Sequence, residues 1–147
     1  MHSHAILLID ANELRASGFA TLFMPWACHS QVDLSVVSEV GEVGDLSAYD
    51  AAVCIYCLGG ASLTDPEIGH RIAHMREVLQ GRPLMALSDL SGRDEVAAAE
   101  RLGLHGFLST TMESHGALAA IQFVLAGGTY LPLSPPVPRN ADGAAVP

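Results

Sequence analysis

The chain has 147 residues, half of them hydrophobic, with 7 Lys and Arg against 16 Asp and Glu and a formal net charge of −9. This length suits one compact domain, and so acidic a balance argues against direct nucleic-acid binding by this segment, because phosphates are bound by clustered Lys and Arg. The sequence shows neither a signal peptide nor an apolar run long enough to span a membrane. Its 3 cysteines are an odd number in a chain without a secretion signal, so we expect a cytoplasmic protein with reduced thiols and no disulfide framework.

Five short apolar runs alternate with longer segments of helical pattern. The runs are unbroken in hydrophobicity, which is typical of parallel strands covered by helices on both faces. We predict strands at Ala5–Ile9, Leu34–Val37, Ala51–Tyr56, Pro83–Leu87 and Gly106–Leu108. Right-handed crossovers between them would give an α/β fold, a doubly wound five-stranded parallel sheet with five helices.

Helix-capping side chains follow most of these runs. Asp10 stands three residues before Glu13, which is the spacing of a capping box. Later helix starts are marked by Thr64 or Asp65, by Ser91 and by Thr110. The helix after residue 65 has the clearest period of 3.6 residues. Its predicted buried face consists of Ile68, Ile72, Met75 and Leu79. The helix predicted within residues 38–49 is weaker, because two glycines interrupt it.

Two helical segments are apolar on all sides, one after the first strand and one after the last. Only Gln122 is polar between Ala117 and Ala126. A helix that covers a sheet should be polar outside, so we predict that the outer faces of these two helices form one partner surface. The residues assigned to it are Phe19, Phe23, Ala119, Ala120 and Phe123, with Leu14 and Leu22 on the inner face.

Two residue patterns could indicate a metal or redox site. Cys54 and Cys57 have Cys-x-x-Cys spacing, but on a strand they point to opposite faces, so buried structural thiols are favoured. His70 and His74 share a helical face, but the sequence offers no third ligand. We expect neither a metal nor a cofactor.

The stretches "ILLIDANELR", "YDAAVCIYCLGG", "LGLHGFLSTT" and "AAIQFVLAGGTYLP" resemble the CheY-like receiver domain of response regulators, of the type that precedes a LuxR-type helix-turn-helix. The resemblance covers Ala5–Pro132, and we assign residues 1–132 to a receiver-like domain. Residues 133–147 are predicted to be a Pro/Ala-rich linker or disordered tail, because their prolines prevent regular structure. It implies a flavodoxin-like sheet of strand order 2-1-3-4-5.

The resemblance also implies a degenerate phosphorylation pocket. Asp10 matches the first acid of the Mg²⁺ pair and Ala11 stands at the second, while Ile55 aligns with the phosphoacceptor aspartate. Ser88 matches the hydroxyl that senses phosphate, and Thr110 stands where a lysine is usual. Phe107 fits the aromatic switch position.

Phosphoryl transfer needs an in-line nucleophile, a divalent cation and a cationic clamp, and all three are compromised here. We therefore predict a phosphorylation-independent pseudo-receiver that is not an enzyme and that acts through protein contacts as a homodimer. In a longer chain, a C-terminal helix-turn-helix domain would follow. Two alternatives stay open: a stand-alone adaptor that binds a kinase or regulator, and a small-molecule sensor that uses the crevice near Asp10, Ser88 and Thr110.

Overall fold

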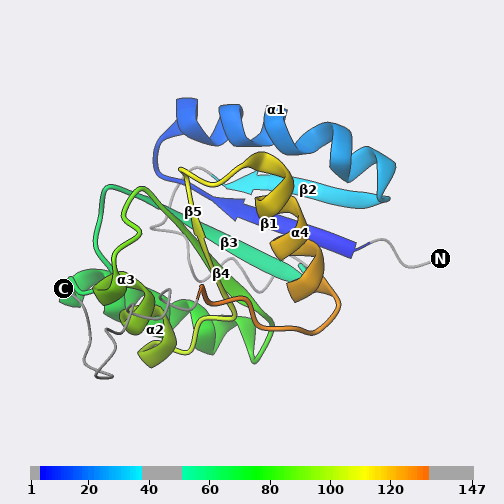
Figure 1. Ribbon diagram of the computed structural model, residues 1–147. Helices are drawn as coiled ribbons and strands as arrows, with labels where there is room; N and C mark the ends of the chain where they lie inside the picture. Colours follow the sequence, from blue (N-terminus) through cyan, green and yellow to red (C-terminus); the bar gives the residue numbers. More distant parts are fainter. Residues whose placement is uncertain (1–3, 38–50, 133–147) are drawn as a thin grey trace, which may run out of the picture.

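The computed structural model describes residues 4–37 and 51–132 (Figure 1). Within these ranges lie five strands and four helices, where five helices were predicted. The missing helix was placed within residues 38–49, which are outside the described residues, as is the predicted tail at 133–147. The elements are β1 (His4–Ile9), α1 (Glu13–His29), β2 (Val32–Val37), β3 (Val53–Gly59), α2 (Pro66–Leu79), β4 (Leu84–Ser88), α3 (Arg93–Arg101), β5 (Gly106–Ser109) and α4 (Ser114–Leu125).

The strands form one parallel sheet of order β2-β1-β3-β4-β5, which confirms the predicted topology. β3 is the central strand, and all of its residues are buried. Because the strands are parallel, their carboxyl ends share one edge, where ligand sites of such sheets are found.

Helices cover both faces of the sheet, with α1 and α4 on one side and α2 and α3 on the other (Figure 1). On α2 the buried residues are Ile68, Ile72, Met75 and Leu79, as predicted. Asp65 also caps this helix as expected, since its side chain accepts a hydrogen bond from the Glu67 backbone N–H. Among the described residues, no helix is long and apolar enough to cross a membrane.

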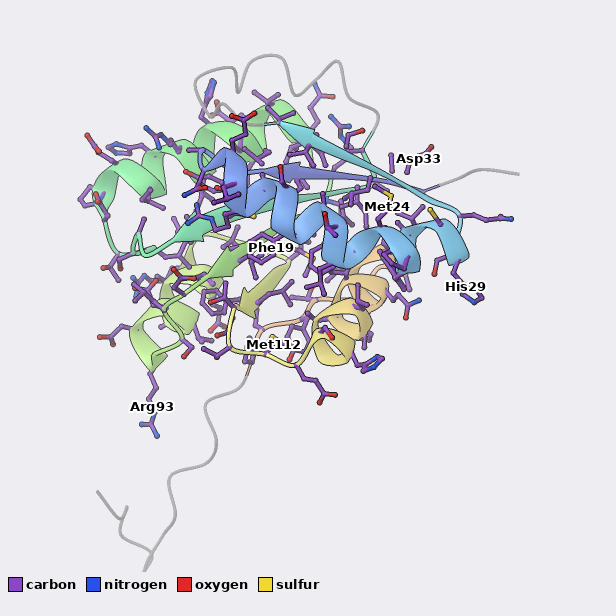
Figure 2. The ribbon with its side chains drawn as sticks, turned by 90° about the horizontal axis from the view of Figure 1, so that it is seen from above. Phe19, Met24, His29, Asp33, Arg93 and Met112 are labelled. Carbon is purple, nitrogen blue, oxygen red and sulfur yellow. The ribbon has the colours of Figure 1, made fainter. Side chains whose placement is uncertain are left out.

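The predicted facing of α1 was wrong. Phe23 is only 3% exposed and lies in the core between α1, α4 and the sheet, whereas Leu14 and Leu22, assigned to the inner face, are 85% and 50% exposed. Phe19 is half-buried and stacks on Phe23, with ring centroids 6.2 Å apart (Figure 2). A helix that is apolar all round carries no periodic signal of which face turns inward.

The outer face of α4 was predicted more closely. Phe123 is 54% exposed and Ala119 is also exposed, as expected. Ala120, assigned to the same face, is instead buried at 3% exposure beside Ile121 and Val124. The exposed apolar surface is therefore narrower than predicted, and on α4 it centres on Phe123.

Candidate functional site

The candidate site lies at the carboxyl edge of the sheet, just beyond the ends of β1, β3, β4 and β5. Asp10 follows the last residue of β1 and is completely buried. The prediction that Asp10 caps α1 was wrong. The N-cap is Asn12, whose side chain accepts a hydrogen bond from the Arg15 backbone N–H at 2.9 Å. The Asp10 carboxylate instead accepts from the Asn12 backbone N–H at 2.8 Å.

The main partner of Asp10 is Arg15, from the first turn of α1. Arg15 Nε donates to Asp10 Oδ2 at 2.7 Å, and Nη2 donates to Oδ1 at 2.6 Å. This two-pronged geometry is the strong form of an Arg–carboxylate pair. The hydrogen bonds raise the pKa of Arg15 above its ordinary value, although partial burial opposes the shift. The buried negative charge of the site is thus neutralised from within the chain.

Gly59, the last residue of β3, makes room for this pair. Its φ is +60°, a left-handed conformation that favours glycine. A side chain there would also collide with the guanidinium of Arg15. A glycine at this point therefore lets the arginine lie against the end of the central strand.

Cys57, and not Ile55, is the β3 residue beside Asp10. Ile9 pairs with Tyr56, so the next residues along the two strands are Asp10 and Cys57. Ile55 pairs with Leu8 and lies two residues before Cys57, on the same face of the sheet. Its side chain is fully buried in the core. β3 runs to Gly59, beyond the predicted end at Tyr56, so the edge of the sheet lies farther along this strand than Ile55.

The thiol at this position is buried and protonated. Burial raises the pKa of Cys57 above its usual range, and the charge of Asp10 raises it further, whereas Arg15 acts in the opposite direction. Burial likewise raises the pKa of Cys54 to about 12. The two thiols belong to the core clusters on opposite faces of the sheet, as predicted. Neither thiol has the lowered pKa of a reactive cysteine.

Hydroxyl groups occupy the β4 and β5 side of the site. Ser88 is fully buried, and its Oγ accepts from the Leu90 backbone N–H at 3.0 Å. Thr110 donates its backbone N–H to the Ser88 carbonyl at 2.9 Å and its hydroxyl to Asp89 Oδ1 at 2.8 Å. The predicted residues Ser88 and Thr110 therefore do lie together, but their hydroxyl groups are hydrogen-bonded to the loop residues that follow β4.

The remaining predicted residues add no ligand to this edge. Ala11 is exposed and has no polar side chain. Phe107 is 1% exposed and lies in the core on the α2 and α3 side, not at the surface. It has no hydroxyl with which to contact a group at the site.

A magnesium ion does not fit the side chains that meet here. Mg²⁺ needs oxygen ligands in near-octahedral geometry, usually including one or two carboxylates. Both oxygens of Asp10 are already bonded to Arg15, whose positive charge would repel a cation, and Ala11 and Cys57 supply no oxygen from their side chains. We derive no step through a metal at this site.

The sequence analysis missed two residues that shape this edge. Arg15 is one, and Glu95 of α3 is the other, a carboxylate only 7% exposed. Glu95 accepts hydrogen bonds from the Ser62 hydroxyl and, at 2.8 Å, from the Leu63 backbone N–H. It thereby ties the loop after β3 to α3. The role of Arg15 could have been suspected from the sequence, because an arginine in the first turn of a helix lies close to an acidic residue at the end of the preceding strand.

Several solved structures with a similar fold are response regulators. A LuxR-family two-component response regulator from Aurantimonas sp. SI85-9A1 superposes with a TM-score of 0.73 at 18% identity, over 91% of each chain. A LuxR-family DNA-binding response regulator from Silicibacter pomeroyi has a TM-score of 0.70 at 15% identity, over 88% of this chain and 97% of that one. A CheY-like response regulator from Mesorhizobium loti has a TM-score of 0.61 at 21% identity, over 83% and 98%.

The described part of the chain thus has the fold of a CheY-like receiver domain. No protein-family model and no curated protein sequence matches the chain. At such low identities, the likeness to the solved structures concerns the fold, and function has to be argued from the side chains at the edge of the sheet.

Proposed function

We propose that this chain is a pseudo-receiver, a signalling module with a receiver fold that is not an enzyme and acts through protein contacts without phosphotransfer. The observation that carries the proposal is the ion pair between Asp10 and Arg15. In a receiver domain that is phosphorylated, the acidic cluster must attract a cation and a phosphoryl donor. Here the carboxylate is buried and already paired with a side chain of its own chain.

The nucleophile supports the same conclusion. A carboxylate is needed beside Asp10 to form an acyl phosphate, and this position holds the protonated thiol of Cys57. Asp89, a further carboxylate at the edge, is bonded to Thr110. A cationic clamp for the phosphoryl oxygens is also missing where Thr110 stands. Each part of the phosphotransfer apparatus is thus replaced or occupied.

The sensor alternative has less support. The hydrogen-bonding groups that a small molecule would need at Asp10, Ser88 and Thr110 are engaged with Arg15, Leu90 and Asp89. Three hollows of the described residues lie between α1 and α4, at the loop before α3, and beside the outer face of α4, and none of the three is lined by Asp10, Ser88 or Thr110.

Phosphotransfer is tested by incubating the protein with acetyl phosphate and Mg²⁺ and measuring its intact mass under conditions that preserve acyl phosphates. We expect no phosphoryl adduct, while a receiver with a complete acidic cluster, treated in parallel, should show one. A stoichiometric adduct that is lost from an Asp89→Asn variant would overturn the proposal.

The proposed output is homodimerisation through the exposed apolar residues of α1 and α4. Leu22, Met24 and Phe123 are all at least 43% exposed, so these large apolar side chains are available for a partner contact. Light scattering coupled to size exclusion should give the mass of a dimer at micromolar concentration. A monomer under these conditions would contradict this part of the proposal.

The setting we propose is transcription regulation. The similar structures from Aurantimonas and Silicibacter pomeroyi are described as LuxR-family regulators, the second as DNA-binding. In a longer chain, a C-terminal helix-turn-helix domain would bind the DNA, and this acidic segment would contribute the dimer contact.

A further inference from the structure

One buried side-chain polar atom in the described part of the chain has no hydrogen-bond partner, the indole Nε1 of Trp26. Trp26 lies in the last turns of α1, and its half-buried ring packs against the core between α1, α4 and the sheet. Because the nitrogen is buried, its N–H has lost solvent as a partner without gaining another. A donor in this state costs free energy, which an arriving acceptor would recover.

The same ring forms part of the wall of a hollow between α1 and α4, with a volume of about 260 Å³. The lining residues are Trp26, Ser30, Val32, Gln122, Leu125 and Ala126. A cavity of roughly 150 Å³ with apolar walls is enough for a benzene molecule. The hollow therefore has the volume for a six-membered ring with one small substituent.

The polar groups of the lining define which substituent fits. The Trp26 N–H can only donate, whereas the Ser30 hydroxyl and the exposed Gln122 amide can donate or accept. The indole ring can turn toward the hollow about its Cβ–Cγ bond, since this torsion has a broad energy profile. A ligand would then need an acceptor for the indole, and a donor on the same substituent could be bound by Ser30 or Gln122.

The electrostatics of the hollow favour a neutral ligand over an anion. Two helices end beside it, α1 at His29 and α4 at Leu125, and the carboxyl end of a helix carries partial negative charge. None of the lining residues is Lys or Arg, and the chain as a whole has a formal net charge of −9. A carboxylate or a phosphate would find no counter-charge here.

We propose that this hollow binds a small neutral molecule, an apolar ring with a carbonyl group whose oxygen accepts a hydrogen bond from the Trp26 indole N–H. Val32, the first residue of β2, lines the hollow, so the site lies at the opposite edge of the sheet from Asp10. The site goes beyond the proposed function and does not rest on it, because it uses none of the residues at the carboxyl edge.

The indole itself reports on the site. Trp26 is the only tryptophan of the chain, so it gives the only indole signal in a proton–nitrogen NMR spectrum. Benzamide should shift this signal downfield as the hydrogen bond forms, and the shift should saturate with a dissociation constant of roughly 1 mM, as suits a ligand of this size. Toluene, which has the ring without the acceptor, should bind about tenfold more weakly or worse. Benzoate should also bind more weakly than benzamide, because it is an anion.

Two variants locate the binding in the hollow. Ala126→Leu places a larger side chain at an exposed lining residue and should weaken benzamide binding by about tenfold or more, because it fills the hollow. Trp26→Phe keeps an aromatic ring but removes the N–H, so benzamide should lose its advantage over toluene, measured from the ligand signals. The control is Leu14→Ala, which changes a side chain that is 85% exposed near the start of α1 and should leave the dissociation constant unchanged.

Circular dichroism checks that each variant is folded. The proposal is overturned if benzamide up to its solubility limit produces no saturable shift of the indole signal. It is equally overturned if toluene binds the wild type as tightly as benzamide, or if folded Ala126→Leu binds benzamide as the wild type does. The acetyl phosphate experiment is unaffected by either result, so the two proposals fail separately.

Discussion

The carboxyl edge of the sheet and the outer face of α4 differ in whether their side chains have partners within the chain. At the edge, every polar group that the receiver resemblance singled out has a partner inside the chain: Asp10 bonds Arg15, Ser88 bonds a backbone N–H, and Thr110 bonds Asp89. On α4, Phe123 and Ala119 remain uncovered. The polar groups of the edge are therefore satisfied within the chain, whereas the apolar side chains on the outer face of α4 are left in solvent.

This contrast indicates where the interactions of the protein take place. A polar site that satisfies itself gains little from a ligand, because binding would have to break existing hydrogen bonds. An exposed apolar surface gains free energy when any matching surface covers it. Under the proposed function, the outer face of α4 is the contact surface and the carboxyl edge of the sheet is part of the scaffold.

Removing Arg15 should have the largest effect on stability of the changes at the carboxyl edge. Arg15→Ala leaves Asp10 buried without its counter-charge, which should lower the free energy of unfolding by about 3–5 kcal/mol. The control is Arg93→Ala, because Arg93 projects into solvent (Figure 2) and its removal should change stability by less than about 0.5 kcal/mol. Urea denaturation measures both. Equal stabilities would show that the ion pair does not hold the edge together.

The buried thiols should make the protein less stable in alkali. The raised pKa values of Cys54 and Cys57 mean that both thiols stay protonated in the folded state at a pH where the unfolded chain already ionises. Since the unfolded state then binds fewer protons, stability is full below pH 9 and falls as the pH rises above it. Between pH 8 and pH 10 the loss should be about 3 kcal/mol for the two thiols together.

The measurement is the free energy of unfolding of the wild type and of the Cys54→Ala, Cys57→Ala double variant at these two pH values. The double variant should lose most of the pH dependence, whatever its stability at pH 8. An unchanged dependence would mean that the thiols are not kept neutral by burial.

Glu95 offers a smaller test at the periphery of the edge. Glu95→Ala leaves the Leu63 N–H and the Ser62 hydroxyl without their acceptor and should cost about 2 kcal/mol of stability. Asp94→Ala, in the same helical turn but exposed, should cost less than about 0.5 kcal/mol and serves as the control. Faster hydrogen exchange at Leu63 in the Glu95 variant alone would locate the effect in the loop after β3.

The fold could be predicted because its signals are local and periodic. The apolar runs mark the strands, and the period along α2 identified Ile68, Ile72, Met75 and Leu79 as its buried face. The facing of α1 could not be predicted, since Leu14, Phe19 and Leu22 are equally apolar and their contacts depend on the neighbouring elements.

The residue composition of the site could be predicted only in part. Asp10, Ser88 and Thr110 follow strand ends, and the structure does bring them to one edge. The sequence could not show which β3 residue lies beside Asp10, because an unbroken apolar run from Ala51 to Leu58 gives no sign of where the strand meets the edge. The pairing of Asp10 with Arg15 depends on how the chain turns between β1 and α1, and no single residue type specifies it.

The most direct test is to add beryllofluoride and Mg²⁺, which mimic the phosphorylated state of receivers, while recording the backbone amide NMR spectrum. We predict no specific shift at Asp10, Cys57, Ser88 or Thr110, because the carboxylate of the site remains bonded to Arg15. Saturable shifts clustered at these residues would show that the edge still binds a metal and a phosphoryl mimic, and would contradict the account of a site closed by its own side chains.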